Sequence, residues 1–171
     1  AEAYLQDGIA ASQQVFGRPL LPICMAIVHQ VTGLSLLHAG LLITTLFYVV
    51  LCVAFVDIVR ILGGKRSVQL IAAIVILSHP WINHTRASIM RDPVYLALLL
   101  LSLRELLLFC RTPSALHQVR WTLLVLAAAL FRFEGFFIAA VAPTALLFTR
   151  SVDKRGQRWL QLLLPQLAIC G

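Results

Sequence analysis

Charged side chains are scarce in this 171-residue chain, and their scarcity limits the class of protein that it can be. Only 12% of the residues are Asp, Glu, Lys or Arg, whereas a soluble domain has roughly 25%. Hydrophobic residues make up 60% of the chain, and its mean hydropathy is +0.91. These values exclude an ordinary soluble domain. They predict an all-α integral membrane protein, a bundle of transmembrane helices.

Cysteine is also scarce, and its placement excludes a disulfide scaffold and a cysteine-ligated metal site. The histidines His29, His79 and His84 have no acidic partner at ligand spacing, which is more typical of a membrane interface than of a metal site. No metal ligand is therefore predicted. The four cysteines stand singly in apolar segments, where packing is the expected role: Cys24, Cys52, Cys110 and Cys170.

The chain has no signal-peptide pattern, internal repeat or low-complexity tract, and it does not begin with Met. Its last apolar segment, starting at Trp159, stops before it is long enough to span a bilayer. We therefore expect the 171 residues to be an internal piece of a longer protein, with little activity of their own.

Several apolar stretches are expected to enter the membrane as helices, since about 20 apolar residues suffice for a crossing. Residues 1–33 are instead expected to form short amphipathic helices in the interface. The expected membrane helices occupy residues 34–62, 67–80, 93–110, 114–131 and 136–149, and residues 159–171 begin a further span.

The stretch Arg132-Phe133-Glu134-Gly135 interrupts an almost unbroken apolar run from Trp121 to Phe148. Two half-depth helices meeting at this break are one interpretation, and a single kinked helix is the other. Because charge at membrane depth is costly, Arg132 and Glu134 either form a buried pair that fixes packing or face a ligand.

The positions of the basic residues predict the orientation, because Lys and Arg collect in short cytoplasmic loops. With those loops inside, residues 1–33, 78–92 and 132–135 fall on the outer side. The outer charges then cancel, and the formal net charge of +7 is cytoplasmic. Topology thus explains the basic composition, and no nucleic-acid partner is implied. The basic residues of these cytoplasmic loops are Lys65, Arg66, Arg111, Arg120, Arg150, Lys154, Arg155 and Arg158.

A second charged cluster, Arg86, Arg91 and Asp92, falls on the same predicted outer side. Asp92 precedes Pro93 and is most simply a helix N-cap, with a part in a binding site as the alternative. Arg86 and Arg91 either anchor lipid headgroups or bind the phosphate of a ligand.

Two charged pairs fall near the predicted cytoplasmic helix ends, Asp57 with Arg60 and Arg104 with Glu105. We interpret them as snorkelling or packing residues.

The order of the outer motifs resembles that of the GT-C superfamily of multi-spanning glycosyltransferases, in particular the mannosyl- and aminoarabinosyl-transferase-like enzymes. The resemblance covers nearly the whole chain and depends on order and spacing more than on any single motif. The motifs are Glu2-Ala3-Tyr4-Leu5, Phe16-Gly17-Arg18-Pro19-Leu20-Leu21-Pro22, Ser78-His79-Pro80, Arg91-Asp92 and Arg132-Phe133-Glu134-Gly135.

The resemblance implies an inverting transfer of a sugar from a polyprenyl-phosphate carrier to a lipid, glycan or protein acceptor outside the cytoplasm. In the family an acidic residue of the first outer loop, usually an Asp before a Tyr, deprotonates the acceptor. Here either Glu2, before Tyr4, replaces that Asp, or the Asp lies upstream of Ala1. A bacterial inner membrane with the site facing outward is the expected location.

The site residues that follow are Glu2 and Glu134 for catalysis, and Tyr4, Arg86, Arg91, Asp92 and Arg132 for substrate binding. The superfamily admits a divalent metal, but no cofactor is predicted.

Two alternative functions, each from a different class of protein, remain open besides the enzyme. A transporter fragment is expected to show paired broken helices in two related halves, whereas this chain has one break and no repeat. A non-catalytic membrane subunit would make Arg132 and Glu134 structural only.

Overall fold

The computed structural model describes Ala1, Leu5 and residues 20–86 and 89–142, without the side chains of Thr85 and Arg86. Apart from a short turn at Leu5, this part of the chain forms helices and no strand, which confirms the all-α prediction for it. The helices are α2 (Leu20–Thr32), α3 (Leu36–Ile61), α4 (Arg66–Ser78), α5 (Pro80–Arg86), α6 (Asp92–Arg111), α7 (Ala115–Phe131) and α8 (Glu134–Val141).

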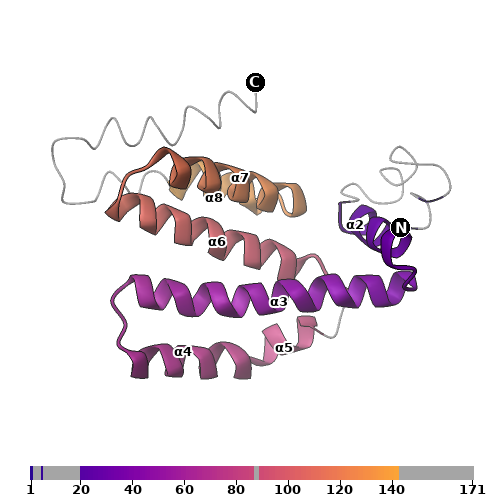
Figure 1. The fold of residues 1–171 in the computed structure, drawn as a ribbon, viewed down its shortest axis with the longest axis horizontal. Helices are drawn as coiled ribbons and strands as arrows, with labels where there is room; N and C mark the ends of the chain where they lie inside the picture. The colour runs from indigo at the N-terminus through magenta and orange to yellow at the C-terminus, as the bar shows by residue number, and fades with distance from the viewer. Residues whose placement is uncertain (2–4, 6–19, 87–88, 143–171) are drawn as a thin grey trace.

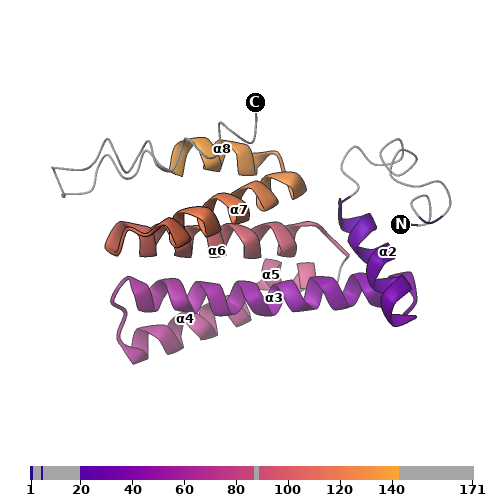
Figure 2. The same cartoon turned by 45° about the horizontal axis from the view of Figure 1, so that its top comes forward.

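The main helices lie side by side in a row (Figures 1 and 2). The long helix α3 is central, with α4 and α5 along one side and α6 along the other. Helix α7 packs on α6, and α8 packs on α7. Helix α2 lies across the beginning of α3.

Most connections between these helices lie at one of two opposite ends of the bundle, measured along the helix axes. The turn from α2 to α3, the start of α6 and the turn from α7 to α8 lie at one end, which we call the α2 end (Figure 1). The connections from α3 to α4 and from α6 to α7 lie at the other end. Because Lys65, Arg66 and Arg111 are exposed there, we call it the basic end.

Capping side chains and glycines set several helix boundaries. The Ser35 hydroxyl accepts a hydrogen bond from the His38 backbone N–H at 3.3 Å and starts α3. Ser114 does the same for α7 through the His117 N–H. After α3, Gly63 has φ +91°, a left-handed conformation that favours glycine and ends the helix.

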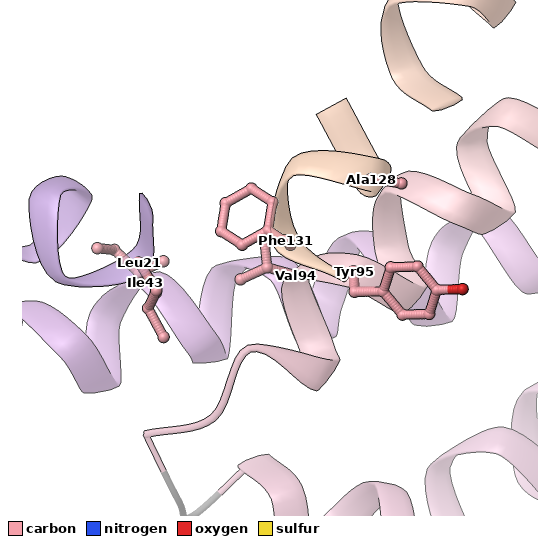
Figure 3. Packing of buried hydrophobic residues seen from close by; sticks show 6 residues of the cluster. All are labelled: Leu21, Ile43, Val94, Tyr95, Ala128 and Phe131. Carbon is pink, nitrogen blue, oxygen red and sulfur yellow. The ribbon is translucent and has the colours of Figure 1, made fainter. Parts of the chain in front are cut away.

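Four helices meet at the α2 end around one hydrophobic cluster. Figure 3 shows its buried side chains, which come from α2, α3, α6 and α7. Close packing of such side chains stabilises the contact between the four helices through van der Waals attraction. The cluster therefore holds the α2 end together. Its members are Leu21, Ile43, Val94, Tyr95, Ala128 and Phe131.

Many large apolar side chains point away from the row rather than into it. Helices α3 and α6 are long and apolar enough to cross a membrane, whereas α2, α4 and α7 are apolar but shorter. Their exposed faces would be unusual in water, because soluble proteins rarely expose large continuous apolar patches. Examples are Leu42, Leu46, Val49 and Val53 on α3, and Leu70, Ile71 and Ile74 on α4.

The break at residues 132–135 is a helical hairpin, so the single kinked helix is wrong. Helix α7 ends at Phe131, and α8 begins at Glu134 and runs back along α7 (Figure 2). Gly135 permits this return, because a Cβ there would lie 2.5 Å from Ala129 Cα. Further along the hairpin, Ala139 of α8 packs in one cluster with Trp121 and Val125 of α7.

The structure also contains a helix that the sequence analysis placed in an outer loop, α5. Pro80 at its first position is a helix-start signal that could have indicated it. Asn83 fixes α5, because its amide donates to the Leu77 carbonyl at 2.6 Å and its Oδ1 accepts from the Tyr48 hydroxyl at 3.1 Å.

Candidate functional site

Arg132 joins two carboxylates from different helices at the α2 end. Its Nη1 donates to Asp92 Oδ1 at 2.7 Å. Its Nη2 and Nε donate to the two carboxylate oxygens of Glu134 at 2.8 and 3.3 Å. This two-pronged geometry suits a guanidinium and a carboxylate. We call Asp92, Arg132 and Glu134 the charged triad.

Helix ends position all three members of the triad. Asp92 and Glu134 each lie in the first turn of a helix, where a negative charge is stabilised by the exposed N–H groups and the helix dipole. Arg132 follows the last residue of α7. The triad therefore lies at the ends of three helices and not halfway along them.

The N-cap interpretation of Asp92 is not what the structure shows. Arg91 is the N-cap residue of α6 and makes no side-chain capping bond. The Asp92 carboxylate instead pairs with Arg132, 40 residues further along the chain. Only tertiary packing brings these two residues together.

Arg132 is constrained on a further side by an aromatic ring. Its guanidinium carbon lies 5.6 Å from the centroid of the Tyr95 ring, within the range of a cation–π contact. Hydrogen bonding to Glu134 raises the pKa of Arg132 above its ordinary value, and the charge of Asp92 adds to the effect. Arg132 is therefore held in place, and each of its three guanidinium nitrogens donates a hydrogen bond to a carboxylate.

An open cleft of about 390 Å³ lies beside the triad. Helix α2 forms one wall, and the segment before α6 forms the other. The walls are mostly apolar, but Asp92 lines the cleft and so connects it directly to the triad. The lining residues are Leu21, Pro22, Met25, Ile89, Met90, Arg91 and Asp92.

Gly40 of α3 lets the two walls of the cleft come together. A Cβ at Gly40 would lie 2.9 Å from Met25 Cε and 2.9 Å from Ile89 Cδ1. The absence of a side chain at this position allows both residues to pack against α3, and a larger residue would require the ends of the Met25 and Ile89 side chains to move.

Arg91 is the cation of the cleft. Its side chain is exposed, and within residues 20–86 and 89–142 it makes no ion pair or hydrogen bond. Arg91 and Arg132 therefore differ: Arg91 has its donors available, whereas Arg132 is engaged by two carboxylates.

Not all predicted site residues fall in the described part of the chain. Glu2 and Tyr4 lie outside it, and for Arg86 only the backbone, at the end of α5, is described. The structure brings together Arg91, Asp92, Arg132 and Glu134. Among the described residues, no group of three or more His, Cys, Asp or Glu side chains is arranged to hold a metal ion.

Sequence reasoning missed Tyr95 and the apolar wall that α2 contributes. Tyr95 follows Asp92 by three residues, and this spacing places both on the same face of a helix. The sequence could therefore have predicted that Tyr95 lies beside Asp92. The contacts of Leu21 and Met25 with the segment before α6 had no signal in the sequence, since they join distant parts of the chain.

No family model, curated protein or solved structure matches this chain in comparisons with known proteins.

Proposed function

We propose that this protein is a membrane glycosyltransferase that takes its sugar from a polyprenyl-phosphate carrier. The observation that carries the proposal is the cleft, in which apolar walls lead to the Arg91 guanidinium, which has no partner among the described residues, and to a carboxylate held by a second guanidinium. An apolar chain with a phosphate at its end matches that combination of surfaces. The resemblance of the motif order to the GT-C superfamily supports the same substrate class.

Membrane insertion is part of the proposal. Helices α3 and α6 have the length and composition for a crossing. The exposed apolar faces of α3 and α4 gain a suitable solvent in lipid, whereas water would penalise them. The basic end is then cytoplasmic, because Lys65, Arg66 and Arg111 lie there, and the cleft opens to the outer side.

The available groups divide the chemistry among them. The donors of Arg91, unpartnered in the part of the chain that the structure describes, bind the carrier phosphate and stabilise the negative charge that grows on it as the sugar leaves. Asp92 lines the cleft, and its Oδ2 has no hydrogen-bond partner among the described residues. Asp92 is thus the best-placed described carboxylate to accept the proton of the acceptor hydroxyl.

Arg132 and Glu134 have a positioning role in this mechanism. Arg132 holds Asp92 by its Oδ1 and fixes the orientation of the carboxylate, while Glu134 fixes the guanidinium in a two-pronged pair. Glu2 stays a prediction from the family resemblance, as the acidic residue of the first outer loop.

A non-catalytic role is the second candidate, and the engagement of all three guanidinium nitrogens of Arg132 favours it. A guanidinium with every nitrogen atom bonded to a carboxylate is suited to hold α6, α7 and α8 together. In that case the cleft would be a packing defect at the surface. Enzymatic and stability measurements on the same variants separate the two candidates.

The donor assay is the most direct test of the proposal. The intact purified protein is expected to transfer sugar from a synthetic polyprenyl-phosphate donor. Arg91→Ala should lower kcat/KM for that donor by about 100-fold, a typical loss for one group that stabilises transition-state charge. Arg66→Ala, which removes an exposed arginine at the basic end, is the matched control and should leave kcat/KM unchanged. Transfer from a soluble nucleotide sugar without any lipid donor would overturn the proposal.

Thiol labelling tests the orientation. In a background that lacks the native cysteines, Met90→Cys and Phe133→Cys should react with an impermeant reagent added outside whole cells. Both side chains are exposed at the α2 end. Lys65→Cys and Arg111→Cys, at the basic end, should react only after the membrane is permeabilised. The opposite pattern would place the cleft in the cytoplasm.

A further inference from the structure

A second charged network lies at the basic end, far along the helices from the triad. Asp57 of α3 pairs with Arg60 one turn later and with Arg104 of α6. Arg104 also pairs with its neighbour Glu105, whose other carboxylate oxygen lies 2.7 Å from His117 Nδ1 of α7. The two pairs that the sequence analysis treated separately thus form one chain of contacts across three helices.

The members of this network differ in how much of their hydrogen-bonding capacity is used. Glu105 has only 5% of its side chain exposed, and both its oxygens have partners. Arg60 is 64% exposed and uses only Nη2, while Arg104 uses Nε and Nη1. Arg60 Nε and Nη1 and Arg104 Nη2 therefore remain available as donors, with no partner among the described residues.

An open groove of about 300 Å³ between α3 and α6 ends at this network. Its lining is apolar along Val49, Val53 and Leu101, and Asp57 and Arg104 form its polar end. The α3 side chains recur at positions that face one side of the helix, so the groove follows the helix axis. Val49 and Val53 are 51% and 63% exposed.

We propose that the groove between α3 and α6 binds an anionic phospholipid from the leaflet at the basic end. An acyl chain lies along Val49 and Val53, and the phosphate receives hydrogen bonds from Arg60 and Arg104. The proposal rests on the proposed membrane insertion, but it does not depend on sugar transfer.

Charge complementarity selects this occupant. The network is formally neutral, because Asp57 and Glu105 balance Arg60 and Arg104, but all four carboxylate oxygens have partners whereas the two arginines keep available donors. Exposed Lys65 and Arg66 add positive charge at the same end. A phosphodiester accepts hydrogen bonds from the remaining donors of Arg60 and Arg104, and its negative charge is attracted to Lys65 and Arg66. Its acyl chain matches the apolar groove, which runs along the helix axis.

The test measures lipid retained by the intact protein after transfer from nanodiscs with equal amounts of phosphatidylcholine and phosphatidylglycerol. Native mass spectrometry should show phosphatidylglycerol retained in preference. Arg60→Gln should reduce that retention at least about fivefold, as expected for one basic side chain at an anionic surface. Lys65→Gln removes an exposed charge outside the network and should change retention less than about twofold.

A second pair of variants tests the groove without changing any charge. Val53→Trp fills the groove and should also reduce phosphatidylglycerol retention, whereas Val75→Trp, on the exposed face of α4, should not. A photo-crosslinker at residue 53 should capture phospholipid.

Several outcomes overturn the proposal. Equal losses in Arg60→Gln and Lys65→Gln would show a diffuse surface effect, and capture of protein at residue 53 would show that a helix fills the groove. If lipid is retained as expected but the donor assay fails, only the proposed function is lost. If the protein inserts into the membrane but retains phosphatidylcholine and phosphatidylglycerol equally, the lipid site is wrong and the proposed function is unaffected.

Discussion

Arg132→Ala is expected to abolish sugar transfer, with a loss of at least about 100-fold in kcat/KM. Without the guanidinium, Asp92 and Glu134 face each other as like charges, and Asp92 loses the bond at 2.7 Å that fixes its orientation. The protein should also lose stability, by about 1–3 kcal/mol, because the triad is partly exposed. Transfer assays and thermal unfolding of the same preparations measure both effects.

Matched variants decide whether Arg132 acts in function or only in packing. Arg120→Ala removes an exposed arginine from α7, the helix that Arg132 follows, and should be nearly neutral in both measurements. Glu134→Gln should weaken transfer while keeping the shape of the pair. The losses of kcat/KM and of stability in the double variant Arg132→Ala, Glu134→Gln should differ from the sum of the two single losses, since both residues belong to one network. Activity that falls only in proportion to the amount of folded protein would favour the non-catalytic candidate.

Gly135→Ala is expected to have the largest effect on stability. A Cβ at this position would lie 2.5 Å from Ala129 Cα and 2.6 Å from the Ala129 backbone nitrogen. Because these are backbone atoms, no rotamer change relieves the contact, and α8 must move away from α7. We expect a loss of about 3 kcal/mol or more, at the upper end of the costs of overpacking.

The displacement of α8 should also reach the site. Glu134 is the neighbour of Gly135, so its two-pronged pair with Arg132 should open, and transfer should fall with stability. Ala140→Val, on the exposed face of the same helix, adds more volume and is the control. Circular dichroism melting and transfer assays provide the readouts. A Gly135→Ala protein as stable as the Ala140→Val protein would show that the close approach of α7 and α8 is not required.

The position of the charged residues illustrates how far sequence reasoning reaches. The Arg132-Phe133-Glu134-Gly135 break was visible as charge within an apolar run, and its pairing of Arg132 with Glu134 is local. The partnership with Asp92 was not visible, because nothing in a single sequence links residues 40 positions apart. The same limit applies to the basic end, where Asp57 and Arg104 are 47 residues apart.

Some helix boundaries could be predicted from the sequence, because the signals that set them are local. Ser35, Gly63 and Pro93 act on their immediate neighbours, so caps and breakers mark the ends of α3 and the start of α6 from the sequence alone. Asp92 shows the converse. Asp is a common N-cap residue, yet the Asp92 carboxylate accepts a hydrogen bond from Arg132 of a distant segment.

The sequence by itself determined the helical class, the apolar surfaces and the presence of a charged break, because composition and local spacing carry that information. Only the tertiary structure decided that the break is a hairpin, that Asp92 completes the triad and that α2 forms a wall of the cleft. Those features depend on contacts between distant segments. Such contacts are selected by the packing of whole helices, through residues such as Gly40 and Gly135, where the absence of a side chain permits close approach.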